Sequence, residues 1–221
     1  MDTVLLSIRS QLLNAFMSLP LILICIVGFL AAGLGNLGLF ILFMGQAVLL
    51  PLVVYGVQTG SSMAKTNTLF TVPSSRVGQL VPGAPGSVRQ NVGPSYWMAH
   101  VLFFMGYLLA NAVSIFTFKP TDKKIDAKLL SNRKSKAMML IIFTVCLTLI
   151  ITGLRYKTGT ETPAGIAVAY VVGGLLGYGW YQFAAVCGAR SADVFGIAQQ
   201  IIPSSAKDDT PMTCVYAAKP V

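Results

Sequence analysis

Long uninterrupted apolar runs fill most of the chain, and polar segments separate them. Five runs cover residues 11–32, 37–57, 97–118, 137–154 and 164–187, and none has Asp, Glu, Lys or Arg in its interior. About 20 residues of helix are needed to cross the hydrocarbon core of a bilayer. The pattern therefore predicts an all-α membrane protein, in which a bundle of about five transmembrane helices forms a single membrane domain.

The first two runs are separated only by residues 33–36, which read Gly-Leu-Gly-Asn. Such a cluster favours a tight turn, so we expect the two helices to form a hairpin that inserts as a unit. Pro20 and Pro51 are expected to interrupt these helices, and Gln46 places an amide near the middle of the second. Because neighbouring helices can satisfy a carbonyl that proline frees, a kink with one interhelical hydrogen bond is favoured over a substrate site.

A polar connection covers residues 58–96 and is rich in Gly, Ser, Thr, Pro and Val. It carries Lys65, Arg76 and Arg89 and no carboxylate. A loop of this length without regular structure is typically functional or disordered, and we expect it to bind a partner through these cations. Residues 67–72 contain β-branched and aromatic side chains that suit a short extended segment.

Small residues recur at intervals of four in two of the runs. In the third run they are Gly106, Ala110 and Ser114, and in the fifth they are Gly165, Ala169, Gly173 and Gly177. Small residues at this spacing let the backbones of two membrane helices approach closely. We therefore expect the small faces of the third and fifth helices to meet.

His100 is the only histidine in the chain and lies within one turn of Trp97, at the start of the third run. Trp and Tyr are enriched at membrane–water interfaces, and Trp97 is expected to be such an anchor. A single histidine at that depth is more often an interfacial hydrogen-bonding residue than a ligand or a catalytic base. We interpret His100 in this way.

The segment of residues 119–136 is strongly basic. Against two carboxylates it holds seven cations: Lys119, Lys123, Lys124, Lys128, Arg133, Lys134 and Lys136. A short basic connection between spans stays on the side where the protein is made, and attraction to anionic headgroups contributes about 1 kcal/mol per cation. We expect this loop to contact lipid headgroups or an acidic partner. In a five-span arrangement the N-terminus is then outside and the C-terminus is in the cytosol.

The tail, residues 188–221, follows the last run. Between residues 191 and 202 its apolar side chains fall on one helical face. Ser191 can cap this segment and Pro203 can end it. The pattern predicts a short amphipathic helix that lies in the membrane interface or docks on a partner.

Composition supports the membrane location, because 55% of the residues are hydrophobic and only 10% are charged, against roughly 25% charged in soluble domains. The net charge of +9 would suit nucleic acid, but seven of the 16 basic residues lie in one segment between two spans. Lipid or an acidic protein is therefore favoured, and no specific nucleic acid is expected. The four cysteines are scattered, which supports neither a disulfide framework nor a metal site.

The chain lacks the motifs of common membrane enzymes. It contains no GxSxG, HExxH, P-loop or CxxC motif. Ion-coupled transporters and proton pumps place ionisable groups inside their spans, and such groups are missing from the five runs. We therefore expect no enzyme activity, no cofactor and no small-molecule substrate.

The end of the fifth run and part of the tail carry a resemblance. Residues 177–203 read GYGWYQFAAVCGARSADVFGIAQQIIP, and residues 211–216 read PMTCVY. These segments resemble the C-terminal ends of small multi-span membrane proteins encoded by large nucleocytoplasmic DNA viruses, which sit in the membrane beneath the icosahedral capsid. The resemblance implies a structural, minor capsid-associated role in the virion inner membrane, which derives from the host during assembly.

Taken with the apolar spans, these patterns favour a structural membrane protein that anchors the internal lipid membrane of a viral particle to its capsid through loops and tail. Its partners would be the bilayer and the capsid or other membrane proteins of the same assembly. The alternative is a small channel or uncoupled transporter with a polar path lined by Gln46, Pro51 and Asn111. An interaction module of cellular membranes would share the same sequence features.

Overall fold

The computed structural model describes residues 16, 18–63, 71–72, 91–92, 94–117, 127–157 and 161–187. Within this part, four helical stretches are long and apolar enough to cross a membrane: Leu37–Gly60, Tyr96–Thr117, Ser131–Lys157 and Pro163–Val186. The prediction of an all-α bundle with several spans is confirmed at this level. The predicted amphipathic helix of residues 191–202 lies outside the described residues.

The helix of the first apolar run, α2 (Leu19–Leu34), is shorter than the predicted span of residues 11–32. Its 16 residues rise about 24 Å, less than the roughly 30 Å of a hydrocarbon core. Residues 11–15 and 17 lie outside the described part, so a fifth span stays a prediction. Pro20 lies in the first turn of α2, where no N–H partner is needed. Phe16 is also helical and Ser18 forms a turn before α2 begins, so an interruption of the first run near Pro20 stays a prediction.

A tight turn joins α2 to α3 (Leu37–Met44). Gly35 ends α2 with a φ of 58°, a left-handed conformation that glycine adopts without a steric penalty. The Oδ1 atom of Asn36 then accepts from the backbone N–H groups of Gly38, at 2.8 Å, and Leu39, at 3.3 Å. These two bonds cap the first turn of α3, and the two helices form the predicted hairpin.

The second apolar run contains a break in its regular winding. After α3 come a π-helical segment, η1 (Gly45–Leu49), and then α4 (Leu50–Met63). Pro51 comes two residues after the end of this segment, and its ring and missing N–H disrupt the regular helical bonds. Local π adjustments of this kind accommodate proline inside membrane helices.

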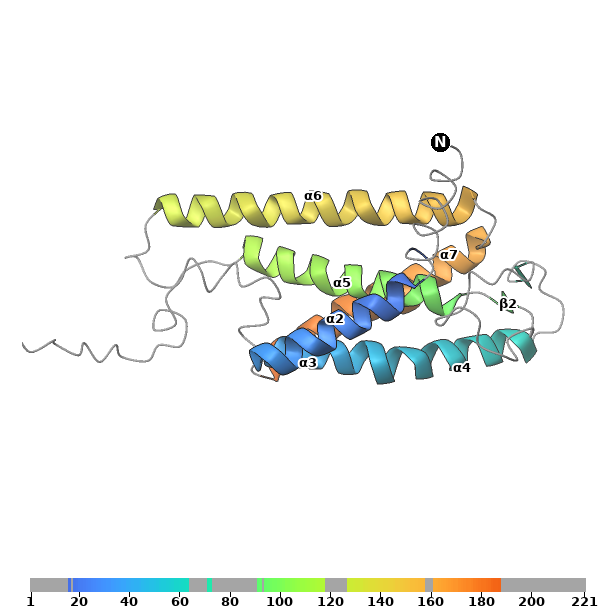
Figure 1. Cartoon of the computed structure of the whole chain (residues 1–221). Coiled ribbons are helices and arrows are strands. Elements are labelled where there is room, and N and C mark those ends of the chain that lie inside the picture. The colour runs from blue at the N-terminus through green and yellow to red at the C-terminus, as the bar shows by residue number, and fades with distance from the viewer. Residues whose placement is uncertain are drawn as a thin grey trace, which may run out of the picture.

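Helix α5 (Tyr96–Thr117) is the central element of the bundle, and most of its residues are buried. Figure 1 shows α6 (Ala127–Lys157) along one side of α5 and the α3–α4 helix on the other side. The last apolar run packs along α5 as well. It consists of α7 (Pro163–Ala169), the π-helical η4 (Tyr170–Leu175) and α8 (Leu176–Val186).

The basic segment is not a loop throughout, as had been expected for residues 119–136. Helix α6 begins at Ala127, so four of the seven predicted contact residues, Lys128, Arg133, Lys134 and Lys136, belong to it. Ala, Lys, Leu and Arg are strong helix formers, and they continue the helix of the span well before residue 137. The other three, Lys119, Lys123 and Lys124, lie outside the described residues.

The polar connection of residues 58–96 is also shorter than predicted, because α4 continues to Met63 and α5 begins at Tyr96. Within it, β1 (Thr71–Val72) pairs antiparallel with β2 (Asn91–Val92). The extended segment expected at residues 67–72 is thus present at its last two residues. The predicted partner-binding cations Lys65, Arg76 and Arg89 lie outside the described residues.

The outer surface of the helices is strongly apolar. Phe29 is 80% exposed, Met139 on α6 is 69% exposed and Leu52 on α4 is 66% exposed. Soluble monomers rarely expose apolar surface this extensively, whereas helices in contact with lipid chains do so throughout. The surface therefore agrees with the character of an integral membrane protein.

Candidate functional site

A buried ion pair lies where the end of α6 meets the start of α7. Arg155 Nη2 is 3.1 Å from Glu161 Oε1, and neither side chain is exposed. Ser95 Oγ, directly before α5, donates to the same Glu161 oxygen and accepts from Arg155 Nη2 at 3.4 Å. One carboxylate therefore ties together the ends of three helices.

Trp97 completes this cluster from α5. The Arg155 guanidinium carbon lies 4.5 Å from the centroid of the Trp97 ring, a cation–π contact that strengthens when it is desolvated. On its other side the Trp97 indole donates through Nε1 to the carbonyl oxygen of Phe16 at 3.0 Å. Trp97 is fully buried, so the expectation that it is an interfacial anchor is wrong, because Arg155 and Phe16 cover it.

The sequence interpretation missed this cluster. Neither Arg155 nor Glu161 was singled out from the sequence. The available signal was that Glu161 is the only carboxylate between Asp126 and Asp193, a position where an isolated charge beside a membrane span requires a partner.

His100 occupies a second buried polar site, between α5 and η1. Its Nδ1 lies 2.7 Å from the carbonyl oxygen of Tyr96, and its Nε2 lies 3.1 Å from the carbonyl oxygen of Gln46. The interpretation of His100 as a hydrogen-bonding residue agrees with this geometry. Within the bundle His100 is unexposed, because η1 packs over the start of α5, and its position at the membrane interface stays a prediction.

Gln46 makes its interhelical hydrogen bond through the backbone and not through the amide that the sequence singled out. The Oε1 and Nε2 atoms of its side chain are buried and have no hydrogen-bond partner among the described residues. Asn111, the other amide proposed for a polar path, donates to the Tyr181 hydroxyl at 3.5 Å. It is buried between α5 and α8.

Two further bonds fasten the hairpin to the rest of the bundle. The Trp180 indole on α8 donates to the carbonyl oxygen of Ile41 at 2.7 Å, and the Tyr107 hydroxyl on α5 donates to the carbonyl oxygen of Gly38 at 2.9 Å. Both acceptors are backbone groups of α3. Trp180, near the end of the fifth run, thus acts inside the bundle.

Small residues bring α5 into direct backbone contact with η4 and α8. A Cβ atom on Gly106 would collide with the carbonyl oxygen of Gly174, and one on Gly177 would collide with that of Phe103. Gly173 lies in the same way against the carbonyl oxygen of Ala99. Such approach is possible only where the side chain is absent.

The remaining small residues divide between this contact and the surface. Ala110, Gly165 and Ala169 are buried, whereas Ser114 is exposed. In a regular α-helix each step of four residues rotates the direction of the side chain by about 40° around the helix axis. Two such steps carry Ser114 away from the face that begins at Gly106, so its expected role in packing is wrong.

The basic residues of α6 also divide between two environments. Lys134 and Lys136 are exposed, as lipid or partner contact requires. Arg133 is only 4% exposed and lies one turn before the buried Ala137 on the inner face of the helix. Arg133 is therefore buried and not part of the expected contact surface.

Among the described residues, no three His, Cys, Asp or Glu side chains form a group that could hold a metal ion. Comparisons with protein-family models, with curated proteins and with solved structures find no match to this chain. The resemblance of residues 177–203 and 211–216 to viral membrane proteins therefore stays a prediction.

Proposed function

We propose that the chain is a structural membrane protein that anchors the internal lipid membrane of a viral particle to its capsid. The observation that carries the proposal is that polar groups in and beside the spans bond to other helices of the same chain. Arg155, Glu161, His100 and Trp180 make contacts that fasten one helix to another. A bundle fixed in this way suits a static anchor, which must resist lateral and vertical movement of its attached layers.

The parts of the chain outside the spans would then make the contacts with the capsid. The connection between α4 and α5 is long and without carboxylates, and the tail carries the resemblance to viral membrane proteins. At the end of the bundle opposite the α4–α5 connection, the exposed Lys134 and Lys136 are placed for anionic headgroups or an acidic partner.

Cross-linking in intact particles tests this proposal. An amine-reactive reagent should join Lys65, or the pair Lys134 and Lys136, to capsid proteins, as identified by mass spectrometry. Replacing these lysines by arginine keeps the charge but removes the primary amine, so the links should disappear without loss of assembly. Particles stripped of their shell before treatment provide the second control. Links only to lipids or to other copies of the chain would overturn the anchoring role.

The alternative of a small channel or uncoupled transporter has one observation in its favour. The buried amide of Gln46 lacks a hydrogen-bond partner among the described residues, and a water-filled path would supply one. Flux of ions or small solutes through proteoliposomes measures this directly. A flux that Gln46→Leu abolishes would favour the channel over the anchor.

A further inference from the structure

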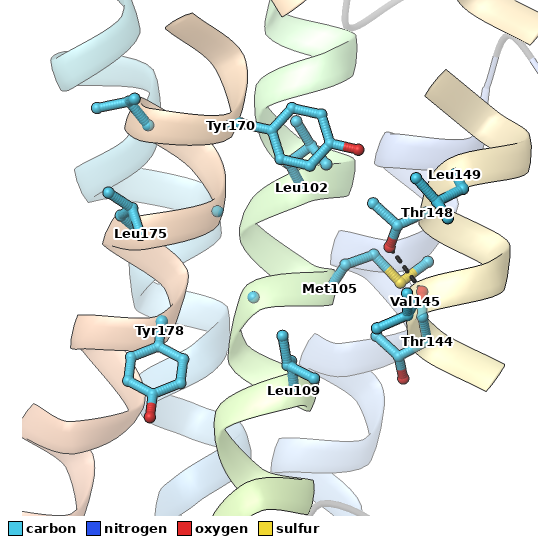
Figure 2. A pocket seen from close by; sticks show the side chains of 13 residues that line it. Leu102, Met105, Leu109, Thr144, Val145, Thr148, Leu149, Tyr170, Leu175 and Tyr178 are labelled. Atoms are coloured by element: carbon cyan, nitrogen blue, oxygen red, sulfur yellow. Dashed lines mark hydrogen bonds between the residues drawn. The ribbon is translucent and has the colours of Figure 1, made fainter. Parts of the chain in front are cut away.

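An apolar groove runs between α6 and the last span, with α5 as its floor (Figure 2). Its volume is about 430 Å³. Met105 and Gly106 of α5 form part of the floor, Val145 and Leu149 of α6 form one wall, and Leu175 and Tyr178 of the last span form the other.

The groove exists because α5 touches the last span closely, whereas α6 packs on α5 but stands apart from the last span. Gly106 and Gly174 have no side chains, so α5 and η4 meet backbone to backbone and leave a shallow floor. Helix α6 approaches from the side and reaches the last span through a hydrogen bond between the Thr152 and Tyr170 hydroxyls, 2.9 Å apart. This bond closes one end of the groove, and the other end opens toward the start of α6.

We propose that this groove holds one acyl chain of an anionic phospholipid, whose headgroup binds at Lys134. The groove lies within helices long enough to span a bilayer, so its open side faces hydrocarbon chains. Its volume falls in the range of roughly 300–1,000 Å³ typical of small-molecule sites. Three turns of a helix about 10 Å wide would occupy on the order of 1,200 Å³, so a chain of methylene groups fits the groove better than a neighbouring helix.

The charge at the open end selects an anionic lipid. Lys134 precedes Val145 by eleven residues, which is about three helical turns and about 16 Å along the axis. Lys134 therefore lies above the groove on the same face of α6, and it is exposed. Glu161 is the only carboxylate whose position the structure describes, and it is paired at the opposite end of α6. No described acid competes for the Lys134 ammonium group.

This inference depends on the membrane location and not on attachment to a capsid, so the lipid and cross-linking experiments can fail independently. The full chain is reconstituted in nanodiscs that contain phosphatidylglycerol and phosphatidylcholine. It is then released into the gas phase, and the lipids that remain bound are counted by native mass spectrometry. One phosphatidylglycerol molecule per chain is expected.

Matched substitutions on α6 assign the two parts of the site. Val145→Trp fills the groove and should lower retention at least tenfold, whereas Ile150→Trp, which is placed on the outward face where Ile150 is 59% exposed, should not change it. Lys134→Gln should reduce the preference for phosphatidylglycerol several-fold, and Lys136→Gln, on a different face of α6, should leave it unchanged. Equal retention in Val145→Trp and Ile150→Trp would overturn the groove site.

A measurement on the unaltered chain guards against a misfolded Val145→Trp variant. Phosphatidylglycerol with a photoreactive group on its acyl chain should label residues of the groove, such as Met105 and Leu149. Labelling spread evenly over Phe29, Leu52 and the other exposed apolar residues would show ordinary annular lipid and would contradict the proposal. A change from monomer to dimer in Val145→Trp, with lipid retention intact, would assign the groove to a second copy instead.

Discussion

The Nε2 atom of His100 lies 3.1 Å from the backbone carbonyl oxygen of Gln46, across the contact between α5 and η1. In a regular α-helix this carbonyl would accept from the N–H of Leu50, but that N–H donates to the carbonyl oxygen of Gly45. In a π turn the donor would be residue 51, which is proline and has no N–H. With its proton on Nε2, the His100 ring supplies the hydrogen bond that the helix of Gln46 lacks.

This relationship predicts energetic coupling between His100 and Pro51. His100→Ala leaves the Gln46 carbonyl without a donor in an apolar interior and should lower the free energy of unfolding by about 1–3 kcal/mol, plus the loss of packing. Pro51→Ala restores an N–H beside that carbonyl. It should therefore stabilise the His100→Ala protein more than it stabilises the unaltered protein, as measured by unfolding in mixed detergent micelles. Equal effects in both backgrounds would show that the two sites are independent.

The contact between His100 and Gln46 also shows where sequence reasoning ends. Four spanning helices could be predicted from the lengths of the apolar runs, because the thickness of a bilayer determines how long an apolar run must be within one segment. The π turn at residues 45–49 follows from Pro51 in the same segment, whereas the π turn at residues 170–175 and the pairing of Arg155 with Glu161 depend on which helices become neighbours, and no single segment carries that information. The helical start of α6 is encoded locally, because residues 128–136 include strong helix formers. The prediction of a loop there rested on their positive charge and not on their helix propensity.

The backbone contact of α8 with α5 predicts opposite effects for two nearby glycines. A Cβ at Gly177 would collide with the carbonyl oxygen of Phe103, whereas a Cβ at Gly179 would meet nothing within 4 Å. Gly177→Ala should therefore force the helices apart and destabilise the bundle by about 1–3 kcal/mol. Gly179→Ala should be neutral or stabilise by up to about 1 kcal/mol through helix propensity. Similar thermal unfolding temperatures for the two variants would contradict the close contact.

The arrangement of the spans predicts which positions share a side of the membrane. Single cysteines at Lys136 and Lys157, in a chain whose four native cysteines are replaced by serine, should react with an impermeant maleimide from opposite faces of sealed vesicles. If α2 crosses the bilayer, a cysteine at Ser18 should react from the same face as cysteines at Gly60 and Lys157. Reaction of the Ser18 position from the Lys136 face would establish four spans in place of five.

The free energy of unfolding should depend strongly on both members of the ion pair between Arg155 and Glu161. Both side chains are fully buried, so removing one leaves the other charge unpaired in a medium of low dielectric constant. Arg155→Met and Glu161→Leu should each reduce the free energy of unfolding by about 3–5 kcal/mol, whereas the double substitution should recover most of that loss. Lys157→Met is the matched control, because Lys157 is exposed on the same turn of α6, and it should change stability by no more than about 0.5 kcal/mol.

Additive losses in the double variant would contradict a simple pair and would point to the other contacts of the cluster. Ser95 and Trp97 also touch the two charged groups, so their packing would then carry the stability. Ser95→Ala separates these cases, since it removes one hydrogen bond to Glu161 while leaving the ion pair in place. A loss of about 1–3 kcal/mol is expected for it, less than for either charge. Because this cluster joins the ends of α5, α6 and α7, its loss should loosen that end of the bundle first, as measured by amide hydrogen exchange near residues 95–98.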